Sequence, residues 1–315
     1  MTDAQQVRVG SSDLEIFPLV LGGNVFGWTA DEAATFAVLD TFVAAGGTML
    51  DTADAYSAWV PGHTGGESES LVGRWLAHQG SRDDVVIATK VSQHPSFQGL
   101  AAGNVRAAAE ASLQRLGTDR IDLYYAHFDD ASVPLEETAA AFSSLVDDGL
   151  VRYVAASNYT AARLDEWMAV ADREGFHHPV ALQPRYNLVE RGFEGALRAS
   201  ADRHGLGVLP YYGLARGFLA GKYRDGGAPV ESPRAEAAAR YLDDRGRRVL
   251  AVLDEVAAAH EVQVASVALA WLRSQPTVVA PIASARNPGQ LVDLLASAVL
   301  ELTSDELHAL SAASA

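Results

Sequence analysis

Ionisable side chains mark the ends of three successive apolar runs in the first half of the chain. Asp51 ends the first run, Lys90 directly follows the second, and His127 directly follows the third. Alone, Asp51 would suggest a turn or a helix cap. A buried lysine needs a counterion, however, and Asp51 on the preceding run is expected to supply it. One carboxylate, one ammonium and one imidazole in this arrangement predict a catalytic site.

Tyr56 lies in the loop that follows Asp51. A phenol ordinarily has a pKa of about 10 and is a weak acid at neutral pH. An ammonium within about 4–6 Å favours the phenolate, so we expect Lys90 to lower the pKa of Tyr56. The phenol could then donate a proton to a developing alkoxide, with His127 as a second donor to the same carbonyl oxygen.

The scarcity of lysine supports a specific role for Lys90. The chain has 24 lysine and arginine residues together, and only Lys90 and Lys222 are lysines. Arginine is therefore used almost everywhere that a positive charge suffices. Lysine differs from arginine because it is a compact charge whose pKa shifts readily on burial.

A metal centre is the alternative interpretation of these polar residues. Asp51, Asp54, His127 and Asp129 carry side chains that can ligate a divalent ion. The spacings HxH and HExxH do not occur, and Lys90 would oppose cation binding. We therefore predict no metal, and a metal-dependent barrel hydrolase stays open as an alternative.

A second polar segment, residues 281–290, is typical of a phosphate site. It places Ser284 and Arg286 in a short loop before a helix that begins near Pro288. Helix N-terminal amides bind anions, and an arginine can bind a phosphate with two hydrogen bonds. A lone cation is disfavoured at this end of a helix, which makes Arg286 a candidate ligand. No GxGxxG or P-loop motif occurs, so a Rossmann-type site is not predicted.

Composition narrows the possible functions. The 315 residues include no cysteine, which excludes disulfides, cysteine-bound zinc, iron–sulfur clusters and thiol nucleophiles. The formal net charge of -16 makes nucleic acid an unfavourable partner. The chain shows neither a signal-peptide pattern nor a run of about 18 apolar residues, so we expect a cytoplasmic protein without a membrane span.

Short β-rich runs alternate with longer segments of helical periodicity. A hairpin is predicted from residues 7–9 and 14–16. Eight strands are predicted at residues 19–21, 49–51, 85–89, 121–126, 153–156, 180–183, 208–211 and 278–281. Helices are predicted at residues 31–45, 68–78, 104–116, 134–148, 160–174, 193–204, 242–260, 288–296 and 304–313, and a large loop at residues 215–241.

This alternation indicates right-handed βαβ units and a parallel sheet, hence the α/β class. Eight units in 315 residues favour a closed (β/α)8 TIM barrel, as a single domain over residues 1–315. We expect the N-terminal β-hairpin to close the bottom of the barrel and residues 304–313 to form an extra C-terminal helix. The active site of such barrels lies at the carboxyl ends of the strands.

The sequence resembles the aldo-keto reductases over nearly its whole length, in particular the bacterial branch related to potassium-channel β-subunits. The matching segments are residues 47–56, 88–90, 116–117, 119, 121–124, 157–159, 183–187, 217–223 and 284–290. The resemblance implies a barrel that binds NADP(H) and reduces a small aldehyde or ketone to an alcohol by hydride transfer. It implies a catalytic tetrad of Asp51, Tyr56, Lys90 and His127, with Tyr56 as the proton donor.

The resemblance also implies which residues contact the cofactor. Those at the nicotinamide are Ser157, Asn158, Gln183 and, stacked on the ring, Tyr211. Those that cover the pyrophosphate are Leu214, Gly217 and Lys222. Those at the phosphate end of the adenosine are Ser284, Arg286 and Gln290.

Fewer residues of the sequence bear on the substrate pocket and on whether the chain is an enzyme or an accessory subunit. Three aromatic residues of the mouth loops, Trp28, Trp59 and Phe128, are candidates to line the pocket. Many aldo-keto reductases have proline and then leucine after a Tyr-Ser pair, where this chain has Tyr212, Gly213 and Leu214. Many also have glycine at the position of Ala283 or Ser284, and often asparagine for the adenine at that of Leu294. Some members of the family act mainly as cofactor-sensing accessory subunits, and this is the alternative function.

Overall fold

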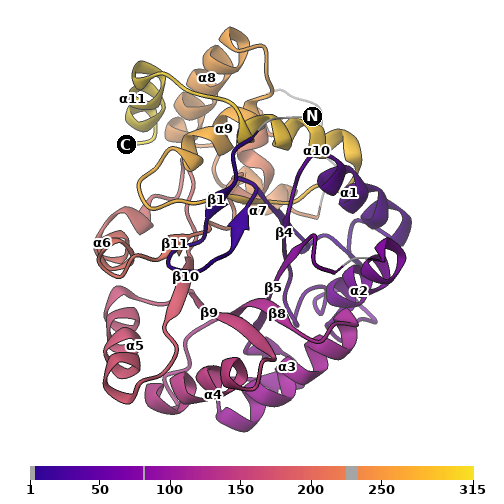
Figure 1. Ribbon diagram of the computed structural model, residues 1–315. Coiled ribbons are helices and arrows are strands. Elements are labelled where there is room, and N and C mark those ends of the chain that lie inside the picture. Colours follow the sequence, from indigo (N-terminus) through magenta and orange to yellow (C-terminus); the bar gives the residue numbers. More distant parts are fainter. Residues whose placement is uncertain (1–3, 81, 225–232) are drawn as a thin grey trace.

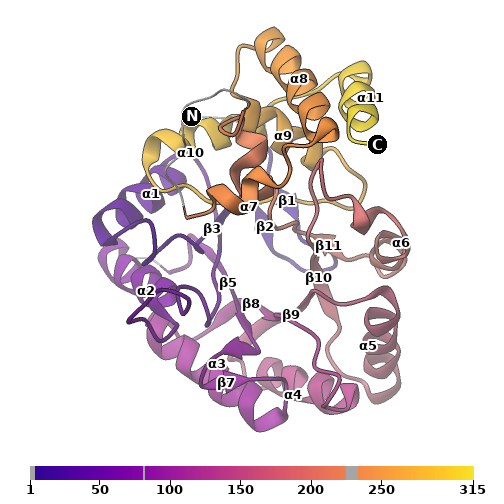
Figure 2. The same ribbon diagram turned by 180° about the vertical axis from the view of Figure 1, so that it is seen from behind.

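The computed structural model describes residues 4–80, 82–224 and 233–315. Within these residues, eight parallel strands form one curled sheet in the order β11-β10-β9-β8-β5-β4-β3-β12 (Figures 1 and 2). The strands are β3 (Val20–Gly22), β4 (Met49–Asp51), β5 (Val86–Val91), β8 (Ile121–Ala126), β9 (Val151–Ser157), β10 (Pro179–Gln183), β11 (Gly207–Val208) and β12 (Ile282–Ala283). The predicted α/β fold with a parallel sheet is confirmed.

Backbone hydrogen bonds join the two ends of this strand order. Val208 N donates to Thr277 O at 3.1 Å, and Val279 N donates to Val208 O at 2.9 Å. On the other side, Val20 N donates to Pro281 O at 3.0 Å. Residues 277–282 therefore bond to both edges of the sheet and close it into a ring.

Helices surround this ring on the outside (Figure 1). The long ones are α1 (Glu32–Ala44), α2 (Glu67–Gln79), α3 (Ala102–Leu116), α4 (Leu135–Asp147), α5 (Ala161–Glu174), α6 (Ala196–Arg203), α8 (Asp244–Ala259), α9 (Val264–Arg273), α10 (Pro288–Leu295) and α11 (Ser304–Ala313). Predicted caps begin α1, where Asp31 accepts from Ala34 N, and α11, where Thr303 and Glu306 form a capping box. None of the described helices is long and apolar enough to cross a membrane.

The N-terminal hairpin packs against the inside of the barrel. Its strands are β1 (Val7–Arg8) and β2 (Glu15–Ile16), and its buried side chains join one apolar cluster with the inward side chains of the sheet. The turn glycine Gly10 has φ +55°, and a Cβ there would lie 2.2 Å from Val180 O, near the start of β10. The hairpin thus closes the end of the barrel at which the strands begin, as Figure 1 shows.

Proline explains where strand prediction was wrong. The predicted strand 208–211 is regular only at Gly207–Val208, because Pro210 and the facing Pro184 have no N–H for a ladder. The predicted strand 278–281 is displaced to Ile282–Ala283 for the same reason, since Pro281 can accept but not donate. The other strands differ from prediction by at most a few terminal residues.

Three further elements differ from prediction. Helix α9 was missed because no side chain caps its start and because residues 265–272 are all buried, with Ser266 as their one polar side chain. The predicted helix 193–204 divides into a 3-10 turn, Gly192–Glu194, and α6, because Gly195 leaves the helical conformation. A small hairpin of β6 (Gln93–His94) and β7 (Phe97–Gln98) was not predicted.

The predicted loop 215–241 contains regular structure at both ends. The 3-10 segment Ala215–Ala220 begins it, and the short helix α7 (Ala235–Ala239) lies near its end. In Figure 2, α7 lies at the rim of the ring, at the end opposite the hairpin. Residues 225–232 of this loop lie outside the described part of the chain.

Candidate active site

Lys90 is completely buried and makes three polar contacts at the mouth of the barrel. Its Nζ lies 2.7 Å from Asp51 Oδ2, 2.7 Å from Thr52 O and 3.1 Å from the Tyr56 hydroxyl. An ammonium has three protons to donate, so each proton has an acceptor. The contacts fix the ammonium between a carboxylate and a phenol, and the predicted pairing of Lys90 with Asp51 is observed.

The backbone explains why these side chains meet. Strands β4 and β5 pair in parallel with Asp51 beside Ala88, and Lys90 lies two residues further along β5, on the same inward face. The chain leaves β4 through hydrogen bonds from Thr52 N to Ala88 O and from Asp54 N to Lys90 O. Tyr56 is thereby turned back over the strand ends.

His127 faces Tyr56 from the neighbouring strand end. Its backbone N donates to Val91 O at 2.9 Å, which fixes the start of the loop after β8. The rings of His127 and Tyr56 are 6.2 Å apart at 73°. His127 Nδ1 is buried without a hydrogen-bond partner among the described residues. A buried polar atom of this kind, beside a phenol, is typical of a ligand site.

Burial governs the protonation states here. It raises the pKa of Tyr56 well above its usual value, and the adjacent Asp51 carboxylate raises it further. The expected lowering of the Tyr56 pKa by Lys90 is therefore wrong in this structure, because burial and the carboxylate dominate. Burial lowers the pKa of Lys90 against the opposing effect of Asp51, and burial together with Lys90 lowers the pKa of His127 well below its usual value. At neutral pH the phenol therefore carries its proton and the imidazole is uncharged.

The residues predicted at the nicotinamide form one network with the tetrad. Gln183 Nε2 donates to Asp51 Oδ1 at 2.8 Å, and Ser157 Oγ donates to Gln183 O at 2.9 Å. Asn158 Nδ2 donates to Ser157 Oγ and to His127 O, at 3.0 and 2.9 Å. The Tyr211 hydroxyl donates to Asn158 Oδ1 at 2.7 Å. The structure thus brings these four residues together beside the tetrad.

The residues predicted at the phosphates gather at another part of the mouth. Lys222 lies within electrostatic reach of Arg286, which together with burial lowers the pKa of its amine. Arg286 N donates to Gln290 Oε1, and Ser284 Oγ donates to Asn24 Oδ1 on the segment after β3. The side chains of Lys222 and Arg286 form no ion pair within the described ranges. Leu214 and Gly217, with φ +98°, belong to the same loop as Lys222.

Sequence reasoning missed two arginines of this region, Arg216 and Arg234. The Arg234 guanidinium lies 5.1 Å from the ring of Trp28 and is affected electrostatically by Arg216 and Arg286. Arg216 lies 4.6 Å from the ring of Tyr212. A signal was available, because basic residues are few in this acidic chain, but no local motif distinguishes these two from surface arginines.

The three predicted pocket aromatics flank Tyr56 and His127. Trp28 and Trp59 contact edge to face at 5.5 Å, and Trp59 lies 6.2 Å from the Tyr56 ring. Phe128 lies 5.2 Å from the His127 ring. Trp59 is 51% exposed and Phe128 is 41% exposed. Large exposed aromatic side chains beside a buried polar group are typical of a binding surface.

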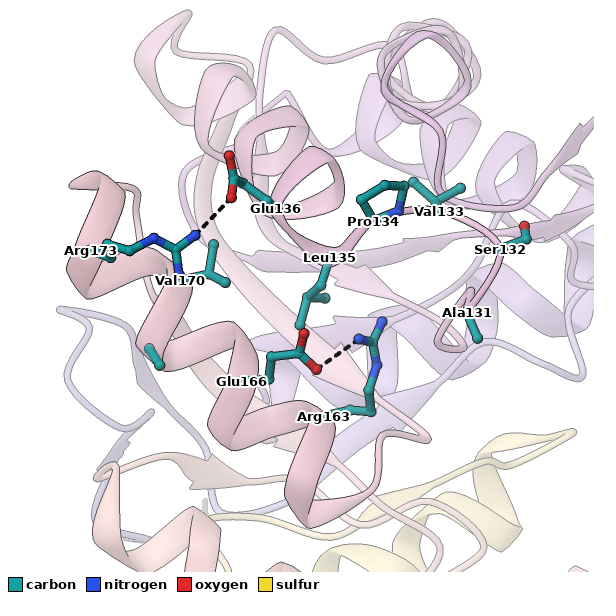
Figure 3. Close-up of a pocket in the computed structure, with 11 residues that line it drawn as sticks. Ala131, Ser132, Val133, Pro134, Leu135, Glu136, Arg163, Glu166, Val170 and Arg173 are labelled. Carbon is teal, nitrogen blue, oxygen red and sulfur yellow. Dashed lines mark hydrogen bonds and ion pairs between the residues drawn. The ribbon is translucent and has the colours of Figure 1, made fainter.

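A groove of about 520 Å³ elsewhere on the molecule is distinct from this mouth. It lies between the start of α4 and α5, and Figure 3 shows its charged side chains paired with each other. Arg173 bonds to Glu136 at 2.7 Å, and Arg163 bonds to Glu166 at 2.9 Å. No residue of the tetrad or of the predicted cofactor contacts lines it. In the residues that the structure describes, no group of three or more acidic or histidine side chains could hold a metal ion.

Comparison with known proteins is consistent with this arrangement. A sequence profile of the Aldo/keto reductase family matches residues 18–315. The chain is 33% identical to Protein tas of Escherichia coli, over 98% of this chain and 97% of that protein. It is 32% identical to a probable voltage-gated potassium channel subunit beta of Oryza sativa, over 92% and 89%. It is 30% identical to the aldo-keto reductase YhdN of Bacillus subtilis, over 92% and 86%.

Proposed function

Because the chain belongs to the aldo/keto reductase family, we propose that it is an NADPH-dependent oxidoreductase that reduces an aldehyde or ketone to an alcohol. The observation that carries this proposal is the contact of Lys90 Nζ with both Asp51 and the Tyr56 hydroxyl, beside His127. We further propose that residues 1–315 act as one domain on a small-molecule carbonyl substrate.

The residues at the mouth fit a nicotinamide cofactor. Lys222 and Arg286 are cations held near each other in a chain of net charge -16, which favours an anionic ligand such as a phosphate. Arg286 precedes α10, whose cap residue Asn287 accepts from Gln290 N. Bound reduced nicotinamide supplies hydride to a carbonyl carbon. Ser157, Asn158 and Gln183 would hold its amide, Tyr211 would pack on its ring, and Leu214 and Gly217 would cover the pyrophosphate.

The chain's own residues divide the proton chemistry. Tyr56 keeps its proton at neutral pH and donates it to the oxygen of the reacting carbonyl, while Lys90 stabilises the negative charge left on the phenol. Asp51 holds Lys90 in place. His127 is neutral, so it orients the same oxygen as a hydrogen-bond donor without competing as an acid. Trp28, Trp59 and Phe128 would line the pocket for the carbonyl substrate.

A direct test compares wild type with Tyr56→Phe. Wild type is expected to consume NADPH when a panel of aldehydes and ketones is added, measured by the absorbance of the reduced cofactor. Tyr56→Phe removes only the donor hydroxyl, so turnover should fall by roughly 10²–10⁴-fold while the Kd for NADPH, from fluorescence titration, stays nearly unchanged. Unchanged turnover in the variant would remove Tyr56 from the proposed role.

An accessory, cofactor-sensing role is the second candidate. The similarity to a probable potassium channel subunit beta favours it, since that protein is named as part of a channel. Single-turnover kinetics separate the two candidates. An enzyme should release oxidised cofactor and cycle steadily, whereas a sensor should give one fast turnover followed by slow release.

A further inference from the structure

The residue that pairs with Lys90 across the sheet is Tyr125 on β8. The two Cα atoms are direct partners in the parallel ladder, so both side chains point into the barrel. Tyr125 is completely buried and belongs to the interior apolar cluster. Its partner on the other side is Ala155, and the small side chain there leaves room for the ring.

The Tyr125 ring lies beside the Lys90 ammonium of the buried ion pair. Lys90 Nζ lies 5.8 Å from the centroid of the Tyr125 ring, within the range of a cation–π contact. The Tyr125 hydroxyl is buried, lies within electrostatic reach of Asp51 and interacts with the side chain of Gln183, which itself donates to Asp51. What distinguishes Tyr125 from its equally buried neighbour Tyr124 is therefore the position of its ring beside the Lys90 ammonium.

We propose that Tyr125 is a positioning residue for the buried ion pair, with its ring within cation–π range of the Lys90 ammonium. It keeps the ammonium charged and directed at Tyr56. Tyr125 does not touch the reacting atoms and acts only through Lys90. This inference rests on the proposed function for its consequence in catalysis, but the contact itself can be tested without turnover.

Several other groups also act on the charge of Lys90. Those that face it are Asp51 at the end of β4, Asp54 and Tyr56 from the segment after β4, Glu69 from α2 and His127 after β8. All of these groups are left in place by a substitution at Tyr125. A change in Lys90 can then be attributed to the ring or to its hydroxyl.

The scarcity of lysine makes a direct measurement possible. Protein labelled with a carbon isotope at lysine Cε should give two side-chain NMR signals, from Lys90 and Lys222. Lys222→Arg identifies which signal belongs to Lys90. The pH midpoint of the Lys90 signal is then followed in wild type, Tyr125→Leu and Tyr125→Phe, without added cofactor.

Tyr125→Leu is expected to lower the Lys90 midpoint by roughly 0.5–1 pH unit, because the charged form loses its contact with the ring. Tyr125→Phe keeps the ring, so its midpoint should lie between those of Tyr125→Leu and wild type. Tyr125→Met, which fills the space without a ring, replaces Tyr125→Leu if the latter does not fold. The alkaline limit of the reduction rate should move in the same direction as the midpoint.

Tyr124 provides the matched control. It is adjacent on β8 and equally buried, but it points outward and its ring lies 5.4 Å from that of Phe142 on α4. Tyr124→Leu should destabilise the protein without moving the Lys90 midpoint. Equal midpoints in wild type and Tyr125→Leu, or equal shifts in Tyr124→Leu and Tyr125→Leu, would overturn the proposal. If Tyr125→Leu shifts the Lys90 midpoint but wild type has no reductase activity, the proposed function is refuted and the positioning role of Tyr125 stands.

Discussion

Two buried carboxylates at opposite ends of the barrel have very different partners. Asp122, at the start of β8, accepts from Arg82 at 2.6 Å, from Arg152 at 3.1 Å and from the backbone N of Ile87 at 2.8 Å. Asp51, at the end of β4, accepts from Lys90 at 2.7 Å and from Gln183 at 2.8 Å. Both are almost fully buried.

The difference between these two sites is the difference between arginine and lysine. A guanidinium stays charged at any pH of interest. The ion pairs of Asp122 therefore persist across that pH range and hold β5, β8 and β9 together. The charge of a buried lysine can change, and here it also contacts a phenol. The end where strands begin thus carries the arginine cluster, and the end where they finish carries the proposed active site, which is its general location in this architecture.

The largest loss of activity is expected for a substitution at Lys90. Lys90→Met should reduce carbonyl reduction by roughly 10²–10⁴-fold, because the phenol loses the cation that stabilises its conjugate base. Lys90→Arg should not restore the rate, since the larger planar group does not fit between Asp51 and Tyr56. Steady-state kinetics at several pH values check this. A wild-type pH profile in Lys90→Met would contradict the pairing.

Asp122→Asn should affect stability and leave catalysis intact. The substitution leaves Arg82 and Arg152 without their shared carboxylate, and because both arginines are partly exposed the cost should be about 2–3 kcal/mol of unfolding free energy. Urea unfolding measures that cost, and kcat per folded molecule serves as the control. A large loss of kcat at full folding would show that the two ends are not separate in function.

Arg286→Ala tests the proposed phosphate contact at the mouth of the barrel. The loss of a charge-assisted contact with a phosphate should weaken NADPH binding by about 10–30-fold. NADH lacks the extra phosphate, so its Kd should change by less than about 3-fold. Fluorescence titration with both cofactors measures this, and Arg224→Ala, whose side chain pairs with Asp254, is a control from a neighbouring loop. Equal losses for both cofactors would place Arg286 elsewhere than at that phosphate.

The smallest effect is expected at the groove between α4 and α5. Arg173→Gln breaks an exposed pair with Glu136, so stability should change by less than about 1 kcal/mol. Cofactor affinity and turnover should equal those of wild type. Thermal unfolding and the same cofactor assays check both expectations. A clear loss of turnover would mean that this groove communicates with the mouth.

The main features of the candidate site could be predicted from the sequence because strand ends are visible in it. Asp51, Lys90 and His127 interrupt or end apolar runs, and parallel strands bring their ends to one rim. The site geometry follows the prediction, while the roles of these residues stay predictions. The pKa direction of Tyr56 was missed, because it depends on how deeply the phenol is buried.

Other features were invisible for physical reasons. Helix α9 begins without a side-chain cap, and its buried residues 265–272 include one polar side chain, Ser266, so little in the sequence marks where the helix starts. Tyr124 and Tyr125 are identical neighbours in the sequence, and only the pleat of β8 decides which one points at Lys90. Arg234 contacts the ring of Trp28, although more than half of the sequence separates the two residues. No local spacing of residues could predict this contact.

The burial of Lys90 has a practical consequence for attaching this protein to a surface. Of the two lysine amines, Lys90 is closed off by its three contacts, whereas Lys222 is exposed and has a lowered pKa. Reagents that couple to lysine side chains should therefore modify Lys222 almost alone, at the rim where the phosphates are proposed to bind. Immobilisation through the Lys222 side chain would then cover the proposed cofactor site, and a cysteine introduced on the face that carries the hairpin would leave that site open.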